Sequence, residues 1–125
     1  GLTAKLPGAA VACVGFPLCG EGSLGGAGQH VQLTHRLLAY LVVLDLITLP
    51  FIFRSRREAP TLVRAAWIGL TLGVLQVGWA AGMVTGGFPA AIRSVHQATG
   101  IMIFVTGFAM WCLARLTTPT SAAAT

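Results

Sequence analysis

Charged side chains are scarce in this sequence. Only 9% of its 125 residues are charged and only three are acidic, whereas 55% are hydrophobic. The mean hydropathy is accordingly high, at +0.81. A soluble domain carries roughly 25% charged residues, so this chain cannot supply the surface that a water-soluble fold needs. The composition therefore predicts an all-α membrane protein that crosses the bilayer several times.

Several signatures of catalytic and metal sites are also missing. The sequence has no phosphate-binding glycine loop, no nucleophile–base constellation, no hydrolytic pair of carboxylates, no C-x2-C zinc spacing and no Met-x-x-Met. No basic region followed by a short apolar core and a cleavage site marks a signal peptide. These absences argue against hydrolases, nucleotide-binding enzymes, and zinc or copper sites.

What the sequence does contain is three apolar runs close to the ~20 residues that a bilayer crossing requires. We expect transmembrane helices at about 31–53, 65–84 and 90–115. Cationic residues gather at one end of these helices, in the first connection and after the third run: Arg54, Arg56, Arg57, Arg64 and Arg115. By the positive-inside rule this end is cytoplasmic, in a multi-pass protein of the plasma membrane. The net charge of +5 thus indicates topology and no nucleic-acid partner.

Residues 1–30 hold eight of the sixteen glycines and are expected to form an irregular outer loop that follows the end of a preceding helix. Cys13 and Cys19 lie in this loop. The outer compartment is oxidising, so we interpret them as a disulfide, with a redox-active pair or two free thiols as alternatives. Residues 116–125 are expected to be a disordered cytoplasmic tail. The abrupt start suggests a fragment that lacks at least one preceding helix.

Polar groups inside the apolar runs are candidates for special roles. Asp45 is costly within a membrane and is expected to face the bundle interior, either as a functional group or as a protonated or hydrogen-bonded packing residue. Gln76 is placed to bond a neighbouring helix. The second run also carries two small-xxx-small pairs suited to close helix packing: Gly69 with Gly73, and Gly78 with Gly82.

Two histidines, His35 and His96, stand at matched depth near the outer ends of the first and third runs. Two neutral imidazoles that face each other across a helix bundle can be the axial ligands of a haem iron. Ala39 and Gly100, each four residues beyond a histidine, would leave room for a flat macrocycle. The alternatives are histidines that only form hydrogen bonds or lie at the membrane interface, or a site for copper or another metal.

Arginines accompany both histidines. Arg36 and Arg93 are expected at the outer rim, where a guanidinium pairs well with a haem propionate. Gly107 should lie on the same face as His96 and leave further room. His30 is expected in the glycine-rich loop before the first helix, solvated and without a ligand role.

Four segments, residues 8–19, 31–36, 75–78 and 95–98, resemble the haem A synthase family in sequence and order. Among them the Cys…Phe-Pro-Leu-Cys loop followed by His-Arg is the most specific. The family is built from two pseudo-symmetric four-helix bundles, each antiparallel, with histidines on its second and fourth helices. The resemblance covers about residues 1–115 and is stronger to the C-terminal half of the family.

The resemblance implies that His35 and His96 hold the iron of a haem b cofactor that relays electrons. The substrate, haem O, would be oxidised in the other half, where its methyl group becomes the formyl group of haem A for terminal oxidases. Gln32 stands where that other half carries a glutamate implicated in the oxidation. The resemblance therefore assigns no catalytic residue to this chain and places the oxidation in the other half.

The resemblance also implies membrane lipid, haem O, haem A, and an N-terminal half or second bundle as partners, with haem O synthase and oxidase subunits as further candidates. Some members have a single bundle and pair up, so a half-size subunit is the alternative to a fragment. Two competing functions stay open. One is a non-catalytic b-type cytochrome subunit for electron transfer; the other is a structural membrane subunit or small transporter without a cofactor.

Overall fold

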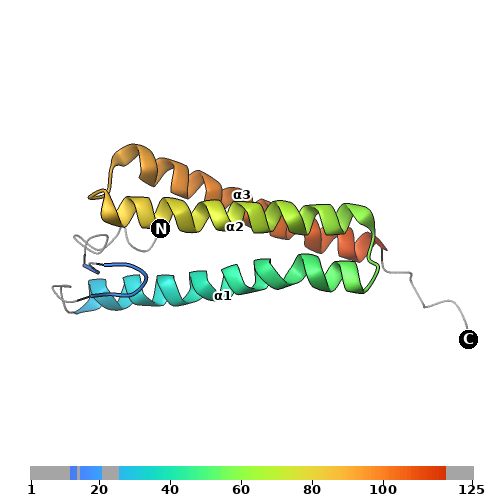
Figure 1. The fold of residues 1–125 in the computed structure, drawn as a ribbon, viewed down its shortest axis with the longest axis horizontal. Helices are drawn as coiled ribbons and strands as arrows, with labels where there is room; N and C mark the ends of the chain where they lie inside the picture. The colour runs from blue at the N-terminus through green and yellow to red at the C-terminus, as the bar shows by residue number, and fades with distance from the viewer. Residues whose placement is uncertain (1–11, 14, 21–25, 118–125) are drawn as a thin grey trace, which may run out of the picture.

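The protein is an all-α membrane protein, and the part of the chain that the structure describes forms three long helices (Figure 1). The computed structural model describes residues 12–13, 15–20 and 26–117, and no strand occurs within these ranges. The helices are α1 (Ala27–Ser55), α2 (Pro60–Thr85) and α3 (Ala90–Thr117). Each is long and apolar enough to cross a membrane. The predicted fold class is confirmed.

Each helix extends beyond the apolar run that predicted it. Hydropathy marks only the part of a helix that suits a bilayer, whereas a helix continues through polar residues until its backbone is capped or turned. Pro60 begins α2, because a proline at the first helical position loses no backbone hydrogen bond. His30 lies in the first turns of α1 and is exposed, so its predicted place in a loop is wrong.

The first two residues of the predicted tail are helical. Leu116 and Thr117 belong to α3, and the rest of the predicted tail, residues 118–125, lies outside the described residues. The same is true of residues 1–11, which were expected to follow the end of a preceding helix.

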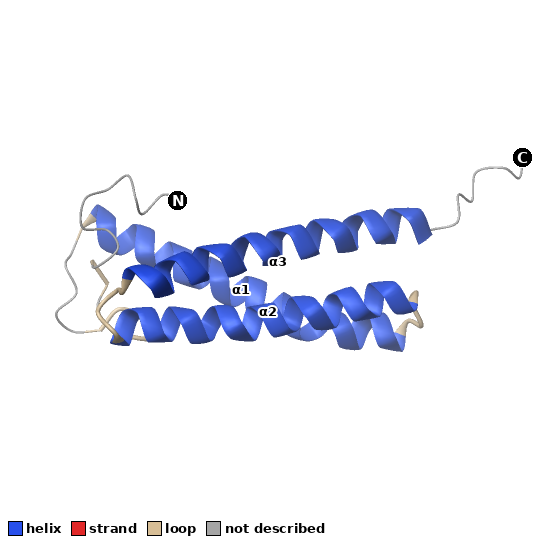
Figure 2. Cartoon of the chain, turned by 90° about the horizontal axis from the view of Figure 1, so that it is seen from above, coloured by secondary structure: helices blue, strands red, loops and turns tan. Residues whose placement is uncertain are grey.

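Helix α2 is the central element. It packs against both α1 and α3, whereas no Cα atom of α1 lies within 8 Å of one in α3. The chain reverses direction at each of the two connections, so α1 and α3 run the same way (Figures 1 and 2). We call the end that holds residues 15–20 and the α2–α3 turn the loop end. The opposite end, with the α1–α2 turn, is the arginine end.

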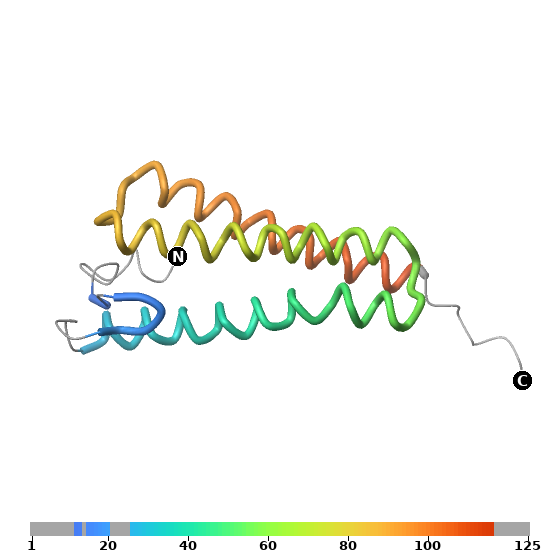
Figure 3. The backbone as a smooth tube through the Cα atoms, viewed as in Figure 1, coloured from blue at the N-terminus to red at the C-terminus, as the bar shows by residue number. Residues whose placement is uncertain are grey.

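The arginine end holds the packed core. Leu62 and Ala66 of α2 are each 1% exposed and contact Met110 of α3. Five partly buried residues from all three helices surround them: Leu49, Phe53, Ala65, Leu113 and Ala114. Figure 3 shows α1 and α2 close together here and apart at the loop end, a divergence that Figure 2 also shows. Helices α1 and α2 are thus packed together at the arginine end and leave space between them at the loop end.

Leu46 of α1 lies at the boundary between these two regions. A Cβ atom built on Gly73 would approach its Cδ1 atom to 2.9 Å, and one on Gly69 would approach its Cδ2 atom to 3.2 Å. The predicted close packing of this glycine pair is confirmed. At Gly78 and Gly82 a Cβ would meet nothing within 4 Å, so that pair makes no close contact within the described residues.

This difference gives a matched pair of substitutions. Gly73→Val should displace Leu46 and lower the free energy of unfolding by about 1–3 kcal/mol, the usual cost of overpacking. Gly78→Val introduces the same side chain into the same helix but into open space, and should cost less than half as much. The comparison can be made by detergent titration followed by circular dichroism. Equal losses in the two variants would contradict this packing.

The outward faces of the helices are apolar, as a lipid environment requires. Phe104 is 75% exposed and Ile101 65% exposed, and all three helices carry further exposed large apolar side chains. Asp45 is an exception, because its side chain is exposed on α1. The prediction that Asp45 faces the interior is therefore wrong for these three helices. The reason is that α1 packs on α2 alone, and Asp45 lies off that contact stripe.

Candidate functional site

A cavity of about 330 Å³ opens between the three helices at the loop end. Leu46 closes it towards the packed core, and most of its wall is aliphatic: Leu38, Val42, Val43, Val77, Ala80, Met83, Val84 and Ile103. The polar groups that reach it are few, namely Gln32, His35, Arg36, Tyr40, Gln76 and His96. An apolar cavity with a few convergent polar side chains is the usual form of a small-molecule site.

Both histidines line this cavity, His35 from α1 and His96 from α3. The two helices do not pack on each other, so the imidazoles approach the space from separate walls, with α2 behind it. His35 is exposed and His96 is half-buried. The structure therefore brings together the two residues that the sequence analysis selected, and their role as ligands stays a prediction.

The residues expected beside the histidines divide into two groups. Ala39 and Gly100 line the cavity, as does Arg36. Arg93 does not line it and is exposed on the first turn of α3. Gly107 lies farther along α3 and is also absent from the wall.

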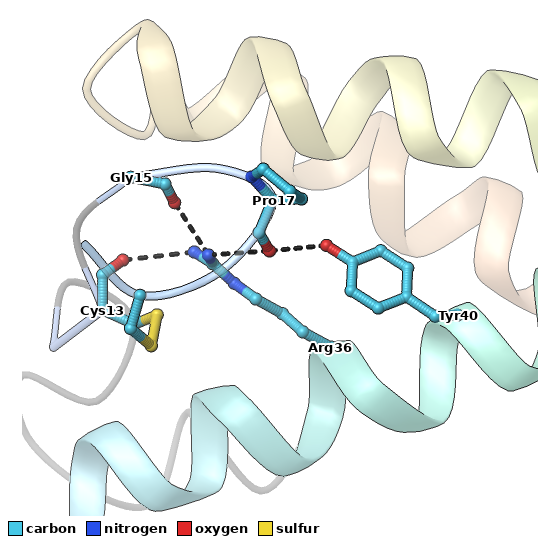
Figure 4. Close-up of a disulfide and its surroundings, with 6 residues drawn as sticks. Cys13, Gly15, Pro17, Arg36 and Tyr40 are labelled. Atoms are coloured by element: carbon cyan, nitrogen blue, oxygen red, sulfur yellow. Dashed lines mark hydrogen bonds between the residues drawn. A yellow bond between two sulfur atoms is a disulfide. The ribbon is translucent and has the colours of Figure 1, made fainter.

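Arg36 anchors the loop of residues 15–20. Its Nη1 atom donates hydrogen bonds to the carbonyls of Gly15, at 2.7 Å, and Pro17, at 3.3 Å. Its Nη2 atom donates to the Cys13 carbonyl at 3.2 Å. Figure 4 shows the guanidinium reaching from α1 into the ring of backbone that these carbonyls line. A planar, always charged guanidinium can satisfy several carbonyls at once, so Arg36 ties the loop to the helix of His35.

Tyr40, one helical turn beyond Arg36, makes a second tie by donating from its hydroxyl to the Pro17 carbonyl (Figure 4). Tyr40 was not predicted from the sequence. Its i, i+4 spacing from Arg36, which puts both on one face of α1, was the available signal. Phe16 of the same loop contributes to the cavity wall. The loop of residues 15–20 therefore forms one side of the cavity.

The two cysteines close this loop. The Cys13 and Cys19 sulfur atoms lie at disulfide-bonding distance, and their Cα atoms are 4.9 Å apart, within the usual range for a bridge. Cys13 is only 1% exposed. Gly15 has a φ of +94°, a backbone conformation that favours glycine, and a Cβ there would lie 3.3 Å from the Gly20 nitrogen. A short, tightly turned loop results.

Gln76 reaches the cavity from α2 and contacts His96. Its carboxamide nitrogen lies 3.3 Å from His96 Nε2, which confirms the prediction that Gln76 bonds a neighbouring helix. Gln76 Oε1 and His96 Nδ1 are both buried without a hydrogen-bond partner. Gly100 makes room for the carboxamide, since a Cβ there would lie 3.3 Å from the Gln76 nitrogen.

The donor set limits which metal could bind. Within the described residues, no group of three or more His, Cys, Asp or Glu side chains converges on one point. A zinc site needs three or four protein ligands, and the cavity offers two imidazoles. Two axial imidazoles suffice for haem iron, because the porphyrin supplies the other four nitrogens. The largely apolar walls of the cavity also fit such a group.

Comparison with known proteins agrees with this chemistry. The model of the cytochrome oxidase assembly protein family, COX15-CtaA, matches residues 8–108. The chain belongs to this family of haem A synthases. A haem A synthase from Exiguobacterium is 37% identical over 90 residues, which cover 71% of this chain and 29% of that protein.

A second relative is more distant. A protoheme IX farnesyltransferase from Haloquadratum walsbyi is 28% identical over 109 residues, which cover 85% of this chain and 22% of that protein. The chain thus spans less than a third of the length of either of these two proteins. No solved structure is matched.

Proposed function

We propose that this chain is the half of a haem A synthase that binds the cofactor haem b, with His35 and His96 as the axial ligands of its iron. The observation that carries the proposal is the meeting of these two imidazoles in one largely apolar cavity, where the described part of the chain adds no third metal-binding side chain. When bound, the haem iron supplies one-electron transfer.

The cavity residues have distinct parts in holding such a group. Ala39 and Gly100 keep the space beside the histidines open, and the aliphatic side chains of α1 and α2 exclude water from the ring. Arg36 uses three of its N–H groups on the loop carbonyls. Because a guanidinium has five, donors remain for a propionate. Arg93, exposed at the start of α3, is the second candidate for a propionate.

Oxidation of the haem O methyl group to the formyl group of haem A belongs, on this proposal, to the other half of the enzyme. Gln32 lines the cavity where that half carries a glutamate. A carboxamide does not ionise and cannot act as a general base, so this cavity is suited to relay electrons and not to oxidise substrate. The loop end lies on the outer side of the plasma membrane, where a Cys13–Cys19 disulfide is stable.

The position of Gln32 also favours a second candidate, a b-type cytochrome subunit without catalytic activity. Both candidates predict the same haem ligands. They are separated by incubating the complete polypeptide, or this chain with its partner half, with haem O and an electron acceptor. Formation of haem A supports the synthase. A protein that retains its haem b but forms no haem A supports the cytochrome.

A further inference from the structure

One polar contact in the cavity is not explained by haem ligation. Gln76 is the only polar residue that α2 contributes to the cavity wall, and it is engaged with the Nε2 atom of His96 at 3.3 Å. Nε2 is the imidazole nitrogen farther from the backbone, whereas Nδ1 is buried. It is therefore the nitrogen that an iron in the cavity would take.

A single lone pair cannot serve both partners. With the Gln76 amide as donor, Nε2 accepts through the lone pair that would otherwise bind a metal. An Fe–N bond to His96 can form only after this hydrogen bond has broken. The proton then resides on Nδ1, which is buried and unpartnered, so the tautomer required for coordination through Nε2 is already present.

From these contacts we propose that Gln76 occupies the coordinating nitrogen of His96 before haem enters and competes with the iron for it. The inference rests on the proposed function. In the haem-free protein the glutamine pairs with a half-buried imidazole whose lone pair would otherwise have no partner. Haem binding must break this hydrogen bond, so the bond lowers the affinity of the protein for haem.

The surroundings of the carboxamide allow the exchange. Its oxygen has no partner, so only the contact through nitrogen holds the group in place. Gly100 faces the carboxamide at a distance that would be tight for a Cβ atom, 3.3 Å. A glycine there lets the amide lie close to α3 beside His96, and the open cavity offers space into which it can withdraw.

The test is haem titration of the full chain, produced under haem limitation and reconstituted in nanodiscs, with Gln76→Leu compared with the wild type. Loss of the competing hydrogen bond, worth about 1 kcal/mol, should lower the Kd for ferric haem about fivefold and increase the rate of capture. Gln97→Leu, which removes an exposed glutamine next to His96, is the matched control and should stay within twofold of the wild type.

A second measurement, which needs no haem, tests the inference if the haem titration of the variant fails. In the haem-free protein, the ¹⁵N resonance of His96 Nε2 should move on Gln76→Leu and stay in place on Gln97→Leu. A Kd for Gln76→Leu that is unchanged or higher, or an unmoved resonance, would overturn the inference. A wild-type chain that binds no haem at all would overturn the proposed function instead, so the two failures are distinguishable.

Discussion

Replacing either His35 or His96 by alanine is expected to abolish the low-spin haem b spectrum of this protein. The two imidazoles line one cavity from helices that do not pack on each other, so neither can be replaced by a neighbour. Within the described residues no cluster of metal-binding side chains offers a substitute ligand. Each single variant should therefore retain at most a weakly held five-coordinate haem, with a shifted Soret band and high-spin features.

His30→Ala is the matched control for this experiment. His30 lies on the same helix as His35, is exposed and does not line the cavity. Its replacement should leave haem content and spectrum unchanged. Circular dichroism of each variant checks that the helices persist. If both ligand variants kept the full wild-type spectrum, the assignment of His35 and His96 would be wrong.

Replacing Arg36 by alanine should release the loop of residues 15–20 from α1. The guanidinium makes three hydrogen bonds to loop carbonyls, and hydrogen bonds to charged groups contribute about 1.5–3 kcal/mol each. Loss of even one such bond corresponds to about a tenfold change in an opening equilibrium. Cys13, buried beside the guanidinium, should consequently become accessible at least tenfold more readily.

The measurement is the rate at which a phosphine reductant and then a maleimide label Cys13 and Cys19 in the intact protein. Arg93→Ala is the control, because Arg93 is exposed and does not line the cavity. Arg36→Lys keeps the charge but loses the planar fork, and should fall between the two. Equal labelling rates for Arg36→Ala and Arg93→Ala would refute the anchoring role.

Much of the fold follows from hydropathy alone, because a bilayer demands long apolar helices and leaves few alternatives. The ends of the helices do not follow, since polar residues such as His30 continue a helix past its apolar run. The face of α1 that packs on α2 could not be predicted from the sequence either. The position of Asp45 within an apolar run could not tell which side of the helix packs on α2, and Asp45 is exposed among these three helices.

Helical spacing was sufficient to predict the part of the site in which residues of one helix share a face. His35 with Ala39, and His96 with Gly100, share a face by their i, i+4 spacing, and all four line the cavity. The bond between Gln76 and His96 depends on the relative height of two helices, which periodicity does not fix. The acceptors of Arg36 are backbone carbonyls of an irregular loop. Carbonyls carry no sequence signal, so only coordinates could identify them.

Low-temperature electron paramagnetic resonance and near-infrared magnetic circular dichroism of the ferric wild-type protein test the central claim most directly. Together they identify the two axial ligands of a haem iron without any substitution. The account predicts one low-spin haem per chain with two imidazole ligands, lost on His35→Ala or His96→Ala. A haem with any other axial pair, or a correctly folded chain that takes up no haem, would contradict it.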